Sequence, residues 1–176
     1  MSFYVIDVEA DNTSPASGSM VCFGAVRVAE GLTDTFYGET APITDDWKPD
    51  ALAVSGFNRE EHEKFQLPSI TIHNFKYWIN ETNTNGRPIF ISDNPAFDWM
   101  WICYYFDKYY LDNPFGFSGR RIGDLYCGMV NDAGKNGEWK RKLRKTRHTH
   151  NPVDDAMGNA EALLAMRAMG LKIGLK

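Results

Sequence analysis

The amino-acid sequence predicts an α/β fold in which a mixed β-sheet, an antiparallel meander followed by parallel strands, is flanked by helices. Three observations predict this fold class. Short β-prone segments follow one another within the first forty residues, apolar strands and segments of helical spacing alternate after them, and a well-capped helix stands near the end of the chain. With 176 residues the chain has the length of one ordinary domain, so we expect a single domain over residues 1–176.

The first forty residues carry the expected meander. A loop rich in Ser, Asn, Gly and Pro separates the first two strands, and Glu30 and Gly31 mark the turn before the third. We expect the antiparallel strands at residues 3–8, 20–28 and 32–37. Helical sequence follows, and we expect two short helices and one longer helix at residues 46–54, 59–65 and from Pro68 to the neighbourhood of Asn85.

Strands and helices then alternate. We expect a strand, a helix, a strand, a helix and a turn-rich segment at residues 88–92, 95–110, 121–122, 125–130 and 131–137. The last helix has the clearest signals, because Asn151 is a natural N-cap and Pro152 suits the first helical position. Met157, Ala160 and Leu164 supply its apolar face.

Composition excludes a disordered or fibrous chain, and the charge distribution points to a possible partner. Hydrophobic residues make up 43% of the chain and charged residues 24%, as in globular proteins. A net charge of −4 argues at first against a polyanionic partner, yet six of the 19 Lys and Arg residues fall within residues 140–147. A basic strip on an acidic body is typical of a protein that binds a phosphate backbone, and a solvated charged loop is the alternative.

The sequence gives no sign of secretion or membrane insertion. The N-terminus lacks a signal pattern and no apolar run approaches the roughly 18 residues of a membrane span, so we expect a cytoplasmic protein. Cys22, Cys103 and Cys127 are widely separated among apolar residues, which favours buried free thiols. Because no CxxC pair exists, a zinc or redox site has little support.

Two carboxylates stand at the end of the first expected strand. Asp7 and Glu9 are separated by one residue, so they point to the same face of the strand, roughly 6.6 Å apart. Such a spacing can hold cations, and buried charges of this kind need metal ions or basic partners. Acidic residues at strand ends are also common without any metal.

Two further acids are expected in the first turns of helices. Asp98 follows the transition from strand to helix, where capping alone explains an acid, as it does for Asp93. Asp155 is fixed in the first turn after Asn151, while His150 lies on the approach to the helix. A rigid carboxylate beside a histidine that can take a proton from water suits metal-assisted hydrolysis.

These acids and the histidine resemble the motifs of the DEDDh branch of the DnaQ-like 3′-5′ exonucleases. The first motif is Asp7 and Glu9, the second is the segment 94–98 ending in Asp98, and the third is His150 followed by Asp155 with four residues between. Residues 53–60 and 122–125 look like the family's segment before its first long helix and its next strand–helix junction. The resemblance runs through the whole chain.

The resemblance implies a ribonuclease-H-like fold and a two-metal-ion exonuclease. Asp7, Glu9, Asp98 and Asp155 would hold two Mg²⁺ or Mn²⁺ ions at the scissile phosphate, with His150 as the general base. Such an enzyme releases nucleoside 5′-monophosphates from nucleic acid with a free 3′ end. Compactness and the basic strip look similar to small exoribonucleases, so we favour RNA over DNA, and similar exonucleases are often homodimers.

Several neighbouring residues receive other interpretations. His148 has a supporting or solvent role, because His150 alone has the family spacing to Asp155. We interpret Asp154 as a helix-cap acid, Asp11 as a loop residue and Asp124 as a structural junction acid. Residues 10–15 depart from the small hydroxyl, Gly and Leu residues that usually follow the first motif, so no contact to the 3′-terminal nucleotide is assigned.

The candidate substrate contacts lie in and beside the basic strip. Trp139 is a candidate for stacking on a base, whereas Trp99 at the helix start is interpreted as core. The full candidate set comprises Trp139, Lys140, Arg141, Lys142, Arg144, Lys145 and Arg147.

Three alternatives stay open. The substrate can be single-stranded DNA rather than RNA, and the chain can be a nonenzymatic nucleic-acid-binding module on the same fold. A third interpretation combines His148, His150 and a carboxylate into an iron-type facial triad.

Overall fold

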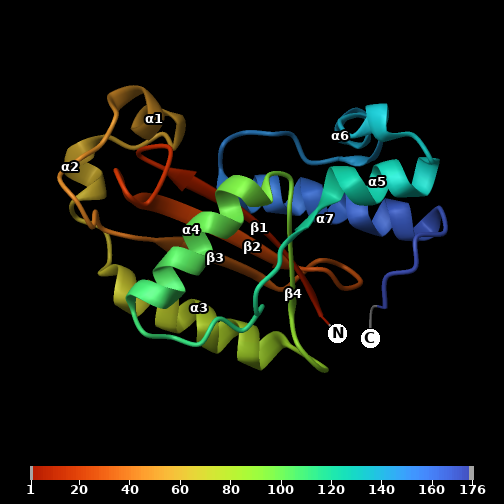
Figure 1. Ribbon diagram of the computed structural model, residues 1–176, viewed down its shortest axis with the longest axis horizontal. Coiled ribbons are helices and arrows are strands. Elements are labelled where there is room, and N and C mark those ends of the chain that lie inside the picture. The colour runs from red at the N-terminus through yellow and green to blue at the C-terminus, as the bar shows by residue number, and fades with distance from the viewer. Residues whose placement is uncertain (1, 175–176) are drawn as a thin grey trace.

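The computed structural model describes residues 2–174, in which a five-stranded mixed sheet lies between helices (Figure 1). The strand order is β3-β2-β1-β4-β5. β1 pairs antiparallel with β2 and parallel with β4, β2 pairs antiparallel with β3, and β4 pairs parallel with β5. The strands are β1 (Phe3–Ala10), β2 (Met20–Arg27), β3 (Thr35–Glu39), β4 (Ile89–Ser92) and β5 (Arg120–Arg121). The predicted meander followed by parallel strands is therefore confirmed.

Helices cover both faces of the sheet. One apolar cluster joins the sheet to α3 and α4, and a second joins its other face to α5, α6 and α7. The short helices α1 and α2 lie near the carboxyl end of β1 (Figure 1). The helices are α1 (Pro49–Val54), α2 (Arg59–His62), α3 (Pro68–Thr82), α4 (Pro95–Lys108), α5 (Ile122–Val130), α6 (Glu138–Leu143) and α7 (Pro152–Ala168), with a 3-10 turn at Ala133–Lys135.

The alternation of side chains along β1 decides where its acids point. Tyr4, Ile6 and Val8 are buried against the α3 and α4 side, whereas Phe3 and Val5 are buried against the α7 side. Asp7 and Glu9 continue the second series because successive strand residues point to opposite faces. Both carboxylates therefore face α7.

The N-terminus of α7 packs directly on the middle of the sheet. Asn151 caps the helix by accepting hydrogen bonds from the backbone N–H groups of Val153 and Asp154, as the sequence predicts. Gly24 lies beside Asp7 in the sheet, and a Cβ atom at Gly24 would overlap the backbone of Pro152. The missing side chain thus lets the first turn of α7 approach the strand that carries Asp7.

Some elements differ from the sequence expectations. β3 begins at Thr35 rather than at Leu32, because Leu32 has a positive φ of 49° and belongs to the turn. α2 ends at His62 and α5 begins at Ile122. Part of the basic strip forms α6, which the sequence analysis did not predict.

The cysteine expectation holds in part. All three cysteines are free, but only Cys22 is buried, while Cys103 and Cys127 are partly exposed. Among residues 2–174, no helix has both the length and the apolar character needed to cross a membrane.

Candidate active site

Three carboxylates from two distant segments meet on the α7 face of the sheet. Asp7 and Glu9 come from β1, and Asp155 comes from the first turn of α7. One oxygen of each lies within 4.8 Å of the others, which is close enough for shared cations. Glu9 is 9% exposed and Asp155 only 1%, so the group lies mostly out of water.

Asp155 is held by donors on both of its oxygens. Its Oδ1 accepts from Arg144 Nη2 at 3.0 Å and from the backbone N–H of Thr149 at 3.2 Å. Its Oδ2 accepts from the backbone N–H of His150 at 3.0 Å and lies 2.8 Å from His148 Nδ1. The loop before α7 therefore wraps around this carboxylate and orients it.

Asp98 approaches the same strand from α4 but is not a member of the three-acid group. Its Oδ1 accepts a hydrogen bond of 3.2 Å from the backbone N–H of Val8, which stands between Asp7 and Glu9. The side chain is only 4% exposed. Helix capping does not explain such burial, and the charge of Asp98 reaches Asp7 strongly enough to change its pKa.

Burial raises the pKa values of Asp7, Glu9 and Asp98. The pKa of Asp7 is raised well above its usual range, first by burial and then by the charges of Asp98, Asp155 and Glu9. Burial likewise raises the pKa of Glu9 to about 7, and that of Asp98 to about 7. Together with Asp155 these three acids form a crowded set of carboxyl groups that favours bound cations, and an all-oxygen donor set suits Mg²⁺ or Mn²⁺.

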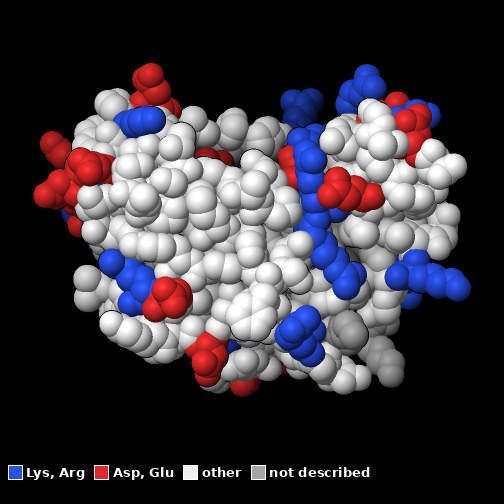
Figure 2. All heavy atoms as spheres, in the orientation of Figure 1, with Lys and Arg blue, Asp and Glu red and all other residues white. Residues whose placement is uncertain are grey.

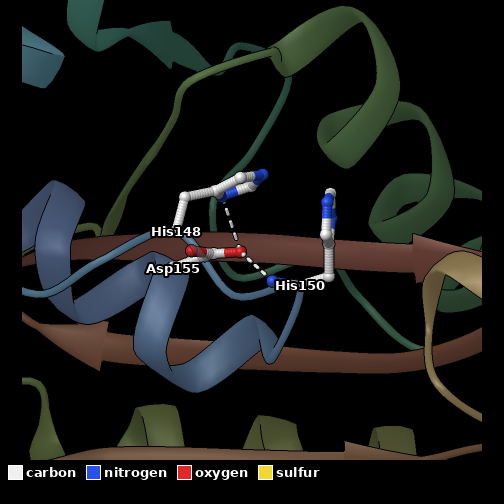
Figure 3. Close-up of side chains that lie close together, drawn as sticks. All are labelled: His148, His150 and Asp155. Carbon is white, nitrogen blue, oxygen red and sulfur yellow. Dashed lines mark hydrogen bonds and ion pairs between the residues drawn. The ribbon is translucent and has the colours of Figure 1, made fainter.

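Two histidines stand at the rim of the acid group (Figure 3). His150 Nδ1 lies 3.5 Å from Glu9 Oε1, and its side chain is 50% exposed. His148 contacts Asp155, and its ring packs edge-on against His150 with the centroids 4.4 Å apart. His150 has a positive φ of 61°, a backbone conformation that is unusual for a residue other than glycine. This turn aims its N–H at Asp155 while its ring rises beside His148 (Figure 3).

Arg144 supplies the nearest guanidinium. Its side chain is 9% exposed and pairs with Asp155, and its charge lowers the pKa of Asp7. A Cβ atom at Gly158 would lie 2.5 Å from Arg144 Nε, so the glycine leaves the space that the arginine fills. Sequence reasoning placed Arg144 in the basic strip but missed its contact with Asp155.

A basic cavity of about 380 Å³ adjoins the acid group. Asp7 lies at its wall together with five of the six basic residues of the strip, namely Lys140, Arg141, Arg144, Lys145 and Arg147. Lys142 is instead paired with Glu138 at 2.5 Å. On the face shown in Figure 2, basic side chains gather in a column between α4 and α5, whereas the surface over α4 carries few charges.

The structure corrects the prediction for Trp139. The side chain is 0% exposed and belongs to the apolar cluster under α7, so it presents no free face to a base. Charged neighbours in the sequence suggest a surface position, but the short α6 turns this one residue inward. Trp99 packs against Phe90 with the ring centroids 4.9 Å apart, in agreement with its interpretation as core.

The remaining acids divide between surface and interior. Asp93 pairs with Lys140 at 2.5 Å, Asp124 lies 3.9 Å from Arg121, and Asp154 accepts from the Thr149 hydroxyl at 3.2 Å. The contacts of Asp124 and Asp154 are local, as expected, whereas Asp93 pairs with a lysine of the distant helix α6. Asp11 differs, because it is fully buried.

Asp11 fastens the loop that follows β1 to α2. Its Oδ2 lies 3.3 Å from Arg59 Nη1 and 3.8 Å from His62 Nδ1. Its backbone carbonyl accepts from the N–H of Lys48 at 2.8 Å. Asp11 is therefore a buried structural acid rather than an ordinary loop residue.

Two glycines that shape the site were also missed by sequence reasoning. Gly24 sits inside an apolar strand and Gly158 inside a helix, two places where glycine costs stability. A glycine inside a strand or a helix therefore indicates that another segment packs closely against it. The sequence alone cannot say which segment makes the approach.

Comparison with known proteins decides the family. A model of the 3′-5′ exoribonuclease Rv2179c-like domain matches residues 2–166. The chain belongs to this family. This chain is also 35% identical over 129 residues to the 3′-5′ DNA exonuclease Cap18 of Escherichia coli, and the alignment covers 72% of this chain and 68% of Cap18.

Solved structures share the fold of this chain. The nuclease domain of 3′hExo, a DEDDh family member bound to rAMP, superposes with a TM-score of 0.80 at 15% identity, covering 99% of this chain and 96% of that one. Cell-death related nuclease 4 gives 0.76 at 16%, covering 96% and 64%. E. coli exonuclease I in complex with a dT13 oligonucleotide gives 0.67 at 16%, covering 97% and 41%. The chain is thus a 3′-5′ exonuclease of the DEDDh type with a ribonuclease-H-like fold.

Proposed function

We propose that this protein is a two-metal-ion 3′-5′ exonuclease that releases nucleoside 5′-monophosphates, that RNA is its preferred substrate, and that His150 is its general base. The observation that carries the proposal is the group formed by Asp7, Glu9 and Asp155, whose oxygens lie within 4.8 Å of one another beside an accessible histidine. Raised pKa values of Asp7 and Glu9 support it, because the site gains from positive charge.

All four acids are proposed to bind the cations. Asp7, Glu9 and Asp155 offer oxygens on one side of β1, and Asp98 offers a carboxylate anchored on Val8. Two divalent ions, Mg²⁺ or Mn²⁺, would neutralise the scissile phosphate and the charge that develops on the leaving 3′ oxygen. With the ions bound, their positive charge allows the acidic site to bind a polyanion. The net charge of −4 therefore does not argue against a nucleic-acid substrate.

His150 is placed to take the proton from the attacking water. Its ring is half exposed and stands over Glu9, while its backbone N–H is fixed by Asp155. The ring can therefore rotate toward the substrate while its anchor stays in place. General-base catalysis of this kind contributes about a hundredfold or more to the rate.

The basic cavity is the proposed path of the nucleic-acid backbone. Its arginines and lysines reach from α6 and the following loop to Asp7, so a strand lying in it would bring a phosphate to the acids. Lys142 completes the proposed set of contacts from its place on α6. Trp139 is no longer part of that set.

The RNA preference rests on the basic strip and on the family description, which names an exoribonuclease domain. The DNA activity in the name of Cap18 keeps single-stranded DNA as the alternative. A nonenzymatic binding module remains a rival of another class, and the intact set of acids and histidine argues against it. The facial-triad alternative also has a geometric basis, because His148, His150 and Asp155 lie together. Tightly held iron in the purified protein would favour it.

One experiment tests these roles together. We expect wild-type protein with Mn²⁺ to shorten 5′-labelled single-stranded RNA from its 3′ end, faster than DNA of the same sequence, and to release mononucleotides. A chelator or Asp7→Asn should abolish shortening, because the cations lose a ligand. His150→Ala should slow it by at least about a hundredfold.

Matched controls separate these effects from general damage. Asp124→Asn removes an acid that is 70% exposed, and His73→Ala removes an exposed histidine on α3. Both should keep wild-type rates. Faster loss of DNA would overturn the RNA preference, and binding of the oligonucleotide without release of mononucleotide would favour the binding module.

A further inference from the structure

We propose that His148, His150 and Asp155 form a second metal site, which takes Zn²⁺ and inhibits the exonuclease when it is filled. One nitrogen of each imidazole and one Asp155 oxygen lie within 4.8 Å of one another. Figure 3 shows both rings rising on the same side of the Asp155 carboxylate. The site shares Asp155 with the three-acid group but draws its other ligands from the loop before α7.

The ligand types distinguish this site from the acid group. Two imidazoles and a carboxylate are ligands that Zn²⁺ prefers, whereas Mg²⁺ prefers oxygen alone. Zinc sites of three protein ligands keep a fourth position for water. The side chains of His148 and His150 are 55% and 50% exposed, so water has access to that position.

The geometry needs only a small adjustment to receive the ion. His148 Nδ1 and Asp155 Oδ2 lie 2.8 Å apart, and ligand atoms of a tetrahedral zinc site stand about 3.4 Å from one another at the usual bond lengths. The exposed His148 ring can supply this movement. His150 is already turned toward its partner ring by its positive φ of 61°.

One charge opposes the ion. Arg144 lies 3.0 Å from Asp155, but it contacts Oδ1, whereas His148 faces Oδ2. The two cations would therefore use different oxygens of the same carboxylate. The arginine weakens the site without occupying it.

Filling this site would block the reaction in two ways. The ion would engage the His150 ring, which then cannot accept a proton, and it would draw on Asp155, which the acid group also uses. This inhibition rests on the proposed function of His150. Zn²⁺ binding itself does not depend on that function.

A binding experiment tests the site directly. Co²⁺ serves as the visible probe in the presence of excess Mg²⁺, which occupies oxygen ligands, and Zn²⁺ is then added to displace it. We expect a Co²⁺ absorption band that Zn²⁺ removes, and affinity at least about tenfold lower in His148→Ala and His148→Gln. His73→Ala should bind as wild type does. Wild-type affinity and spectrum in both His148 variants would overturn the proposal.

An activity measurement tests the inhibition separately. Each protein is assayed with fixed Mn²⁺ and increasing Zn²⁺, and its rate is divided by its own rate without Zn²⁺. Wild type and His73→Ala should lose activity at Zn²⁺ concentrations that displace Co²⁺, while His148→Ala should need at least about tenfold more. Equal sensitivity of His148→Ala would overturn inhibition through this site. A protein that cuts no oligonucleotide at all refutes the proposed function instead, while the Co²⁺ experiment still decides the site.

Discussion

Asp155 shows how a single carboxylate is prepared for function by its surroundings. Backbone N–H groups of Thr149 and His150 and the Arg144 side chain fix both of its oxygens. A ligand held this firmly loses little freedom when it binds an ion or a substrate. The same contacts tie the position of the proposed base to that of the proposed ligand.

His62 provides a prediction at the residue scale. The side chain is fully buried and burial lowers its pKa to about 4, whereas an unfolded histidine titrates near 6.5. Below pH 6.5 the unfolded chain takes up a proton that the folded chain refuses, so His62 costs stability as the pH falls toward 4. His62→Gln should flatten this slope, by at most about 1.4 kcal/mol per pH unit.

Denaturant unfolding at several pH values between 4 and 7 checks this prediction. The raised pKa values of Glu9 and Asp98 act in the opposite direction, because the folded state then binds more protons and stability falls as the pH rises. Both acids are common to the two proteins and cancel in the difference. His73→Gln, at an exposed position, is the control. An unchanged slope in His62→Gln would contradict the prediction.

At the scale of single residues, the motif residues could be predicted from the sequence, whereas contacts between distant segments could not. Asp7, Glu9, Asp98, His150 and Asp155 follow from order and spacing, and the structure brings them to one region. The Arg144–Asp155 pair and the burial of Asp11 depend on how distant segments meet, which local sequence does not encode. Trp139 was predicted wrongly because its charged neighbours hide an inward position.

The first turn of α7 is the element on which the site depends. It carries Asp155, and it lies against β2 at Gly24, where a side chain would overlap the backbone of Pro152. Backbone on both sides leaves little room to adjust. The position of Asp155, a proposed metal ligand, therefore depends on the missing side chain at Gly24 in β2.

Gly24→Ala should therefore displace α7. We expect a loss of about 1–3 kcal/mol in the free energy of unfolding, from overpacking, together with a larger loss of Mn²⁺ affinity than Asp124→Asn causes. Gly128→Ala is the control, because a Cβ atom there meets nothing within 4 Å on α5. That variant should gain up to about 1 kcal/mol from helix propensity. Denaturant unfolding and Mn²⁺ titration measure both quantities, and equal stability of the two variants would refute the close-packing argument.

Elements with strong local signals were predicted well. Asn151 and Pro152 gave the start of α7, and Pro95 gave the start of α4. The six-residue α6 was missed because its charged sequence lacks a cap and an apolar stripe. The start of β3 was predicted too early because Leu32 is β-prone but adopts a left-handed turn conformation. Tertiary contacts rather than propensity set such a turn.

Charge is distributed across the whole molecule so that an acidic protein keeps one basic surface. Removal of residues 140–147 from the count leaves far more acids than bases, and five basic residues of that strip line the cavity beside Asp7. Binding of nucleic acid should therefore depend on salt more strongly than the net charge suggests.

Salt dependence checks the proposed path of the strand. In an Asp7→Asn background that prevents cleavage, Lys145→Gln should reduce the slope of log affinity against log salt by up to about 0.7, the value for one phosphate contact on a single strand. Lys64→Gln removes the same charge from an exposed position outside the cavity and should leave the slope unchanged. Fluorescence anisotropy with a labelled oligonucleotide gives both slopes, and equal slopes would place the strand elsewhere.

The fold was predictable at this scale because the meander, the alternation and the order of the motifs agree with one another. The family follows from the same order. A single domain over residues 1–176, a cytoplasmic location and a homodimer stay predictions, since they depend on surroundings and partners rather than on this pattern.

The three-acid group takes its members from opposite ends of the chain, Asp7 and Glu9 from the first strand and Asp155 from the last helix. During synthesis, a growing polypeptide can form the meander long before α7 leaves the ribosome. We expect such an unfinished chain to be harmless to the messenger that encodes it. Stalled ribosome complexes that display residues 1–145 should leave a labelled oligonucleotide intact, and cleavage by them would show that the last helix is dispensable.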